Sequence, residues 1–397
     1  MAVKLGNGNW AVKEDKLLAY NDNSGRFFNK EFDFARGSSA TYVGKDGLIK
    51  SAASGVPRID FSDSSSGALL LEPQSTNLLT YSESFNQWSL TGATIASNAL
   101  ISPDGTLNAD KLVESTSSTQ HRINFTTTSS SGNNTFSVFA KKGEREFLWV
   151  RIGLSSGYFN LNNGFSSDGT GIIASSIDYG NGWYKCIINK ANSVANEVCR
   201  INITDNFGGG DYQGDGTSGA YIWGAQYEQS SFATSYIPSL SGSATTRSAD
   251  ACNNVGNEQA INSQSGALFG EFKTDPDGGN FLISISENNN NGGAVFIGAD
   301  ANEKIYTYYN SANHVSDINS YDSFNKVCIS WSSDGVKIYI NGLSKTVLGS
   351  QALSTSNYNN IKFSRANTSL KFLGQIKHLQ VFTTALTDEQ LAALTTI

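Results

Sequence analysis

Proline, methionine, histidine and cysteine are all scarce in this chain, and charged residues are few. The 397 residues include 5 Pro, 1 Met, 3 His and 4 Cys, and only 16% of them are Asp, Glu, Lys or Arg. Residues that favour helices are correspondingly few, whereas 22 Phe, 16 Tyr and 6 Trp supply the aromatic side chains that disordered chains lack. With its many Gly, Asn and Ser residues, the composition predicts an all-β protein of short strands joined by polar turns.

Basic residues are fewer than acidic ones, with 28 Lys and Arg against 35 Asp and Glu. The formal net charge is −7, and no segment of the sequence offers a basic face, which argues against binding to nucleic acid phosphates. No apolar run reaches the ~18–20 residues that span a bilayer, so we expect no membrane insertion. The stretch MAVKLGNGNWAVKED lacks the apolar core of ~7–15 residues that a secretory signal requires. We therefore expect synthesis in a cytoplasm without export by the ordinary secretory route.

The four cysteines are too dispersed for a metal-binding motif. Cys186, Cys199, Cys252 and Cys328 form no CxxC pair and have no histidine nearby at metal-ligand spacing. Cys186 and Cys199 lie on either side of a predicted turn and could face each other across a hairpin. Because Cys is among the most buried residue types and the compartment is reducing, buried thiols are the favoured interpretation. A pairing of these two cysteines stays open.

Hydrophobic patterning divides the chain into irregular and regular parts. Residues 1–75 show no regular strand spacing, and we interpret them as an extended N-terminal segment that packs against something else. Residues 76–245 and 253–397 each contain short runs of alternating apolar and polar side chains, and small polar residues at 246–252 form a linker. The predicted fold class is all-β, with two jelly-roll or β-sandwich domains in tandem and one short C-terminal helix.

Local signals predict particular turns and the helix. Asp-Gly pairs at 46–47 and 334–335 stand between alternating runs and predict tight hairpins. Near the C-terminus, Thr387 and Gln390 have the spacing of a capping box before an apolar stripe. We therefore expect a helix to begin at this point.

Motifs for catalysis are incomplete. Residues 153–157 fit G-x-S-x-G, but no helix pattern follows, as a nucleophile elbow requires. Residues 31–34 begin like the carboxylate strand of sandwich-fold glycoside hydrolases and lack the second carboxylate. Residues 120–122, Gln-His-Arg, come nearest to the Tyr or His beside Arg and Gln or Asn that a lyase would use. We expect no enzymatic activity, with a polysaccharide lyase or hydrolase as the alternative.

Carboxylates gather in one glycine-rich stretch, DNFGGGDYQGDGTSG. Its Asp205, Asp211 and Asp215 could offer the hard oxygen ligands that calcium prefers. Their spacing matches no defined calcium loop, and Asp-Gly pairs also simply make turns. Calcium is thus the one cofactor candidate, and no other cofactor is expected.

Tyrosines beside polar turns are candidates for glycan binding, because a flat ring stacks on a sugar face while neighbouring amides bind its hydroxyls. Tyr158, Tyr212, Tyr308 and Tyr358 lie near turns rich in Asn and Gly. The competing interpretation is structural, since most aromatic side chains of a sandwich belong to its core.

Two long strings resemble a block that recurs in tailed-bacteriophage fibre, spike and head-fibre proteins. The first is FDFARGSSATYVGKDGLIKSAASGVPRIDF with the following GALLLEPQSTNLLTYSESFNQW. The second, YIWGAQYEQSSFATSYIPSLSGSATTRSAD, closes a carbohydrate-binding-module-like jelly roll in such proteins. The strings KVCISWSSDGVKIYINGLSKTVL and GQIKHLQVFTTALTDEQLAAL resemble a concanavalin-A-like (laminin-G-like) domain. None of these resemblances supplies a catalytic residue.

The resemblance implies a virion subunit that displays sugar-binding sandwiches. Residues 1–75 would then attach to other virion proteins, and the subunit would form a homo-oligomer, expected to be a trimer. The leading hypothesis is non-catalytic adhesion to host-surface glycans. A purely structural decoration or adaptor protein and a polysaccharide depolymerase, lyase or glycosidase, are the alternatives. The host, the sugar and the position on head or tail stay open.

Overall fold

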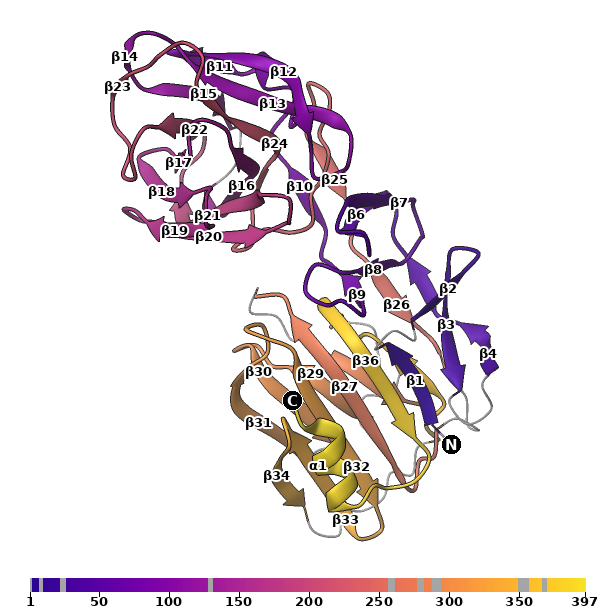
Figure 1. The fold of residues 1–397 in the computed structure, drawn as a ribbon. Coiled ribbons are helices and arrows are strands. Elements are labelled where there is room, and N and C mark those ends of the chain that lie inside the picture. Colours follow the sequence, from indigo (N-terminus) through magenta and orange to yellow (C-terminus); the bar gives the residue numbers. More distant parts are fainter. Residues whose placement is uncertain are drawn as a thin grey trace. The chain divides into compact units, whose positions relative to one another are not determined.

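The computed structural model confirms an all-β fold (Figure 1). The residues it describes are 2–6, 10–21, 26–127, 131–255, 261–276, 282–287, 294–310, 312–348, 357–365 and 370–397. Within these ranges the strands pair antiparallel throughout, and the only α-helix is α1 (Asp388–Thr395).

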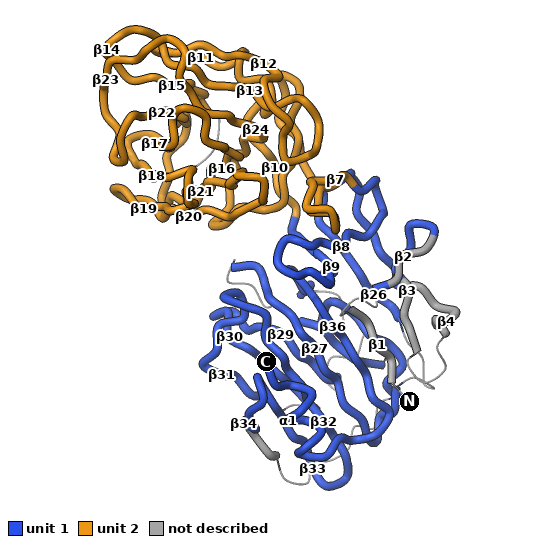
Figure 2. Tube along the Cα trace, viewed as in Figure 1, with its two compact units in different colours: residues 1–39, 52–73, 248–397 blue, residues 40–51, 74–247 orange. Residues whose placement is uncertain are grey.

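The chain forms two compact units, coloured separately in Figure 2. Unit 1 contains residues 1–39, 52–73 and 248–397, and unit 2 contains residues 40–51 and 74–247. The range 1–75, interpreted from the sequence as an extended segment, is divided between both units and contains strands. Each unit is therefore built from pieces distant in the sequence, which local patterning does not reveal.

Unit 2 is a sandwich of two six-stranded sheets. One sheet runs in the order β11 (Ser89–Thr91), β15 (His121–Thr126), β22 (Val198–Thr204), β17 (Phe147–Ile152), β18 (Ser155–Asn160) and β19 (Phe165–Asp168). The other runs β12 (Ala93–Ile101), β13 (Leu107–Glu114), β24 (Gly219–Glu228), β16 (Gly132–Lys142), β21 (Trp183–Ser193) and β20 (Ile173–Asp178). Smaller pairs are β6 (Ala40–Val43) with β7 (Ile49–Ala52), β10 (Ser75–Asn77) with β25 (Thr245–Arg247), and β14 (Ser118–Thr119) with β23 (Tyr212–Gln213); η1 (Phe85–Gln87) is a short 3-10 helix.

The core of unit 2 follows the alternation of its strands. Phe136 and Val138 of β16 and Ile201 of β22 have no exposed surface and belong to one hydrophobic cluster. Because successive side chains of a strand point to opposite faces, the residues between them lie on the outer faces of the sheets. The pairing of β6 with β7 also confirms the hairpin predicted at 46–47.

Unit 1 packs a large sheet against a five-stranded one. The large sheet has eleven strands in the order β2 (Ala11–Lys13), β3 (Lys16–Asn21), β1 (Ala2–Gly6), β36 (Gly374–Phe382), β27 (Gly266–Thr274), β32 (Asn325–Ser332), β33 (Gly335–Ile340) and β34 (Leu343–Leu348), with β4 (Arg26–Glu31) beside β3, and with β9 (Ala68–Leu71) beside β36 and β8 (Arg58–Asp60) beside β9. The smaller sheet runs β31 (Ala312–Asn319), β30 (Lys304–Tyr309), β29 (Val295–Ala299), β28 (Leu282–Ser286) and β35 (Asn360–Lys362). A separate pair joins β5 (Asp33–Ala35) to β26 (Ala251–Asn253).

Residues 246–252, predicted to be a linker, are partly strand. Residues 245–247 form β25 and residues 251–253 form β26, and each of these strands pairs with a strand from the first 77 residues. Short polar runs can thus form strands when a partner supplies the hydrogen bonds.

The C-terminal helix confirms its predicted start. The Thr387 side chain accepts a hydrogen bond from the Gln390 backbone, and the Gln390 side chain accepts one from the Thr387 backbone. Leu391 is fully buried in a small cluster with Phe269 and Cys328. Among the described residues, no helix is long and apolar enough to span a membrane.

All four cysteines are buried and free. Cys186 lies on β21 and Cys199 on β22, which belong to different sheets of unit 2 and form no hairpin, and both thiols are free, so the two cysteines do not pair in this structure. Burial raises the pKa of each thiol, because the charged thiolate loses its hydration. These cysteines are core residues.

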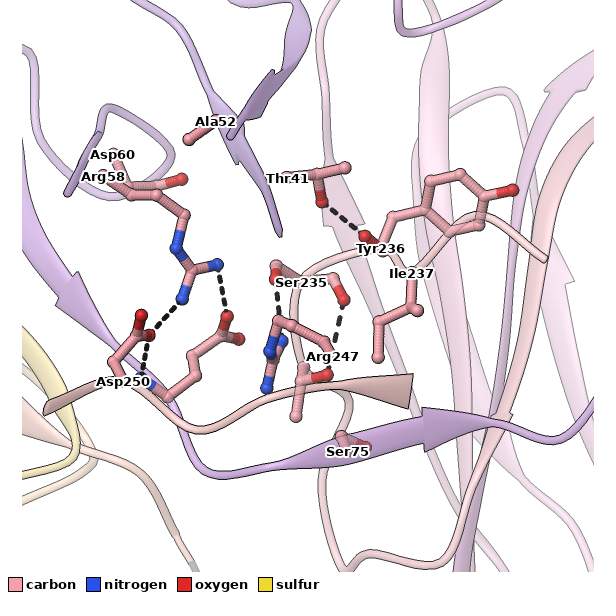
Figure 3. Close-up of polar contacts among 12 residues, drawn as sticks. Thr41, Ala52, Arg58, Asp60, Ser75, Ser235, Tyr236, Ile237, Arg247 and Asp250 are labelled. Atoms are coloured by element: carbon pink, nitrogen blue, oxygen red, sulfur yellow. Dashed lines mark hydrogen bonds and ion pairs between the residues drawn. The ribbon is translucent and has the colours of Figure 1, made fainter. Parts of the chain in front are cut away.

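A buried ion network joins distant segments of unit 1. Arg58 donates to Glu72 (2.6 Å) and to Asp250 (2.5 Å), and the second oxygen of Asp250 accepts from Arg36 (3.2 Å). The bond between Arg58 and Asp250 is drawn in Figure 3. Arg36, Arg58 and Asp250 have no exposed side-chain surface. All four residues belong to the strings that carry the resemblance. In unit 1 these strings therefore contribute buried structural contacts.

In unit 2 the same strings supply further buried contacts. Thr41 donates its hydroxyl to the backbone carbonyl of Tyr236, and Arg247 donates to the Ser235 hydroxyl (2.9 Å; Figure 3). Both bonds tie segments outside the two main sheets to the loop that follows β24. In unit 2 too, residues of these strings stabilise the fold through buried hydrogen bonds.

Candidate functional site

Aromatic and arginine side chains gather on the outer face of the sheet that contains β17 and β22. On β17, Leu148 and Val150 point into the core, so Phe147, Trp149 and Arg151 lie on the opposite face. We call this surface the aromatic–arginine face and define it by eight strand residues: Arg122, Phe147, Trp149, Arg151, Tyr158, Phe165, Arg200 and Asn202.

Strand register brings these residues together. Trp149 lies opposite Tyr158 on β18 and opposite Asn202 on β22. Arg151 lies opposite Arg200 on β22. Side chains directly opposite each other on one face are neighbours, with Cβ atoms about 4.5–5.5 Å apart. The face is therefore a continuous surface built across several strands.

The aromatic side chains form one contiguous group. The rings of Trp149 and Tyr158 are stacked, with centroids 6.1 Å apart and an interplanar angle of 11°. Phe207, in the loop after β22, lies 6.0 Å from Tyr158, 5.5 Å from Phe165 and 6.0 Å from Phe147, between ring centroids. Phe165 is 57% exposed and Phe207 39% exposed. Exposed apolar rings of this kind are typical of binding surfaces.

A glycine loop approaches the face closely. At Gly209 a Cβ would lie 2.7 Å from Cε3 of the Trp149 ring, and the backbone φ is +76°. A side chain at this position would meet the ring and strain the backbone. Glycine at position 209 is therefore required for the loop to cover the edge of Trp149.

The arginines of the face have no carboxylate partner among the described residues. Arg151 lies over Trp149, with its Cζ 4.5 Å from the ring centroid. Arg200 donates to the Gly153 carbonyl (2.6 Å), and Arg122 donates to the Gln120 side chain. Their hydrogen bonds thus go to neutral groups, which leaves the positive charges uncompensated.

The electrostatics reflect this crowding of like charges. Burial lowers the pKa of Arg151, and the positive charges of Arg200 and Arg122 lower it further. Burial and Arg122 lower the pKa of Arg200 in the same way. No carboxylate of the described residues counters these shifts. The sequence predicted that no segment offers a basic face; the three arginines that meet here come from three separate strands, β15, β17 and β22.

Several buried polar atoms of the face lack a hydrogen-bond partner in the part of the chain that is described. They are Nε1 of Trp149, Oδ1 of Asn202, and Nε of both Arg122 and Arg151. Buried polar groups are normally paired, so each unpaired one requires an explanation. The face therefore carries unused hydrogen-bonding capacity.

Of the four candidate tyrosines, Tyr158 alone lies on this face. Tyr358 has no exposed surface and packs in the core of unit 1, and Tyr212 is 8% exposed. Tyr308 belongs to unit 1, is half-buried, and packs against Phe296 with ring centroids 5.1 Å apart. A buried ring offers no flat surface to a sugar, so Tyr212 and Tyr358 are structural residues in this fold.

Tyr212 instead takes part in a polar cluster around Glu114. Its hydroxyl donates to Glu114 (2.6 Å), and Arg145 donates to both carboxylate oxygens (2.6 Å each). Burial opposes ionisation of Glu114, but the bonds from Arg145, Tyr212 and the Asp215 backbone outweigh it and lower its pKa. Burial and then the bond to Glu114 raise the pKa of Tyr212. The cluster anchors the loop before β24.

The proposed calcium ligands do not converge. Across the described residues, no group of three or more His, Cys, Asp or Glu side chains could hold a metal ion, so Asp205, Asp211 and Asp215 form no such site. Asp215 accepts hydrogen bonds from Thr217 and Ser218, which lower its pKa. Its carboxylate closes a turn, which is the alternative that Asp-Gly sequences always allow.

Sequence reasoning missed most of the face, although one signal was present. In EFLWVRIGL the residues that alternate with Leu148 and Val150 are Trp149 and Arg151, so this outward face could have been read from the strand. The position of Arg200 opposite Arg151 could not be predicted in this way, because the pairing of strands depends on residues distant in the sequence. The Gln120–His121–Arg122 motif contributes only Arg122, since His121 is buried.

Comparison with known families adds to this geometry. Residues 255–392, within unit 1, match the concanavalin A-like lectin/glucanases superfamily. This agrees with the predicted concanavalin-A-like domain and with the observed sandwich. The superfamily name covers both binding proteins and enzymes, so the match defines the class of fold. No curated protein matches the chain.

Solved structures resemble the chain only distantly. The sialidase carbohydrate-binding module CBM40 of Ruminococcus gnavus, bound to α2,3-sialyllactose, is 17% identical, with a TM-score of 0.30, over 36% of this chain and 94% of that one. Domain 4 of the Geobacillus stearothermophilus arabinanase AbnA, with arabinotriose, is 15% identical, with a TM-score of 0.30, over 37% of this chain and 73% of that one. Mouse laminin α1 domains LG4-5 are 10% identical, with a TM-score of 0.24, over 78% and 95%. At these scores the likenesses carry no argument about function.

Proposed function

We propose that this protein binds glycans without cleaving them, through the aromatic–arginine face of unit 2. The observation that carries the proposal is one surface on which Trp149, Tyr158 and the exposed Phe165 adjoin arginine and asparagine side chains. A flat aromatic ring stacks on a sugar, and amide and guanidinium groups bind its hydroxyls. The lectin-type match of unit 1 supports the same class of function.

The biological setting we propose is the virion of a tailed bacteriophage, where the protein is a fibre or spike subunit that adheres to host-surface polysaccharide. The resemblance of the strings from residue 32 onward supports this setting. The proposal includes attachment to other virion proteins through residues 1–75 and assembly as a homotrimer. A purely structural decoration protein would share the setting and bind no sugar.

The test is a glycan array probed with the purified full-length protein and with Trp149→Ala and Tyr158→Ala. We expect the wild-type protein to bind a defined set of glycans and both variants to lose about 1–3 kcal/mol of binding free energy, the value of a stacked aromatic contact. Tyr221→Ala, a half-buried tyrosine on the other sheet of unit 2, is the matched control. Binding that is absent in the wild type, or unchanged in both variants, contradicts the proposal.

A specific observation favours a second candidate, polysaccharide lyase activity. Tyr158 shares its face with Arg151 and Asn202, which are the kinds of groups a lyase uses to remove a proton and to neutralise a neighbouring carboxylate. Incubation of acidic polysaccharide with the protein distinguishes the two functions. Unsaturated chain ends that form with the wild type and not with Tyr158→Phe would establish the lyase.

A further inference from the structure

Three positive charges of the aromatic–arginine face are not neutralised by the chain. Among the described residues, Arg58 and Arg145 each form an ion pair with a carboxylate, whereas Arg122, Arg151 and Arg200 form none. This happens in a protein with a net charge of −7, where acidic side chains outnumber basic ones. What distinguishes this face is that three arginines without a described carboxylate partner lie together on it.

The register holds the three arginines close together. Arg151 and Arg200 lie directly opposite each other on β17 and β22. Arg122, on β15, lies opposite Asn202, two residues from Arg200 along β22, and is thus its diagonal neighbour. Diagonal neighbours are about 7–8 Å apart, a distance that long side chains span. Three guanidinium groups can consequently reach one ligand.

Like charges placed side by side destabilise a fold, and no described carboxylate reduces the repulsion here. An anion held between the arginines would offset it. The unpartnered Nε atoms of Arg122 and Arg151 and the unpartnered Oδ1 of Asn202 show that these side chains are not used up by internal hydrogen bonds. The aromatic group adjoins them through the contact of Arg151 with Trp149.

We propose that the aromatic–arginine face binds an anionic glycan, whose carboxylate or sulfate groups pair with Arg122, Arg151 and Arg200 while a sugar ring lies on the neighbouring aromatic side chains. The inference rests on the proposed glycan-binding function and names the ligand class for the same surface. Both anions match the fork of the guanidinium group, which forms two parallel hydrogen bonds to them.

The experiment uses the full-length protein and an array of neutral, carboxylated and sulfated oligosaccharides. The bound member is then titrated beside its carboxyl-reduced or desulfated form, which separates the two sources of negative charge. Arg151→Gln and Arg200→Gln should each weaken binding about ten- to a hundred-fold, because each removes a hydrogen bond to a charged group. The matched lysine variants keep the charge but lose the fork, so they should retain part of the affinity.

Lys45→Gln is the control, because it removes the same charge from an exposed position of unit 2 away from the face. It should leave binding unchanged. Thermal melts show that the variants fold: Arg151→Gln should melt within about 4 °C of the wild type, since relief of repulsion offsets lost packing on Trp149. High salt should weaken binding of the anionic glycan.

The outcomes separate the inference from the function on which it rests. Preference for anionic glycans that is lost in Arg151→Gln supports the inference. Equal binding of charged and neutral forms overturns the inference and leaves glycan binding in place. No glycan binding overturns both. An oligomer that dissociates when Trp149 is replaced by Ala shows that the face is a contact between subunits, which also overturns the inference.

Discussion

At the scale of single residues, the fold is most sensitive at a buried ion network. It is formed by Arg36, Arg58, Glu72 and Asp250. Asp250 accepts from both arginines and from the Glu72 backbone. A buried charge that loses its partner is strongly destabilising, whereas the intact pair contributes little beyond specificity. The network therefore favours one arrangement of three segments distant in sequence. Removal of one of its charges should greatly lower the free energy of unfolding.

We predict that Asp250→Asn destabilises the protein by about 3–5 kcal/mol, because the buried guanidinium groups of Arg36 and Arg58 both lose the charged carboxylate that lies between them. Urea denaturation of the full-length protein, followed through the unfolding of unit 1, measures the change. Asp63→Asn is the matched control: it removes a carboxylate that is 40% exposed and pairs with Lys273, and it should cost no more than about 1 kcal/mol. Equal losses in the two variants would contradict the account.

Glu114 predicts a pH dependence. Its pKa is lowered in the folded protein, so its ionised form stabilises the fold above the unfolded pKa of about 4.3, and this stability is lost as the pH falls through the folded pKa. Glu114→Gln should therefore lower the melting temperature at about pH 7 and have little effect at about pH 3. A difference from the wild type that persists unchanged at low pH would show that the ionised carboxylate is not the cause.

At the scale of elements, the glycine loop after β22 determines how much of Trp149 is exposed. Gly208, Gly209 and Gly210 all have φ values in the region that favours glycine, at +122°, +76° and +135°. Only Gly209 of these three meets the Trp149 ring. A positive φ thus favours glycine at all three positions, whereas close approach to the ring requires it only at Gly209.

We predict that Gly209→Ala displaces this loop from the ring and weakens glycan binding at least about tenfold, since the new Cβ would overlap the ring and strain the backbone. Tryptophan fluorescence reports the change around Trp149, and titration with the bound glycan reports affinity. Gly208→Ala also strains the backbone, with φ at +122°, but has no atom within 4 Å of its new Cβ. If both variants behave alike, backbone strain and not contact with the ring is responsible.

At the scale of the whole molecule, the two units differ in how far their strands are contiguous in the sequence. Both six-stranded sheets of unit 2 lie between residues 89 and 228. In unit 1, β36 pairs with β27 on one side and with β1 and β9 on the other. The C-terminal sandwich therefore depends on strands from the first 73 residues.

We predict that fragment 74–247 folds alone with a cooperative thermal transition, whereas fragment 253–397 does not. Without β1 and β9, β36 becomes an open edge with unpaired backbone groups, which favours aggregation. Circular dichroism melts and size-exclusion chromatography of both fragments test this. A monomeric, cooperatively folded 253–397 would show that the N-terminal strands are dispensable.

Assembly is the remaining prediction at this scale. Single sugar sites on open surfaces bind weakly, and several linked copies raise avidity by about 10²–10⁴. We expect a homotrimer at micromolar concentration. Light scattering that gives the monomer mass of 42.5 kDa would contradict it.

Local patterns of the sequence predicted much of the fold. Composition predicted the all-β class, alternation predicted strands within residues 76–245, and the spacing of Thr387 and Gln390 predicted the helix start. These features depend on neighbours within a few residues, because side chains alternate along a strand and a helix cap spans one turn.

The tertiary structure decided how the residues of the site come together. Which strand pairs with which placed Arg151 opposite Arg200 and brought Arg122 beside them, although the sequence has no basic segment. Packing likewise buried Tyr212 and Tyr358, while Tyr158 lies on the aromatic–arginine face. Strand register and burial result from contacts between residues far apart in the chain, whose free energies no local pattern contains.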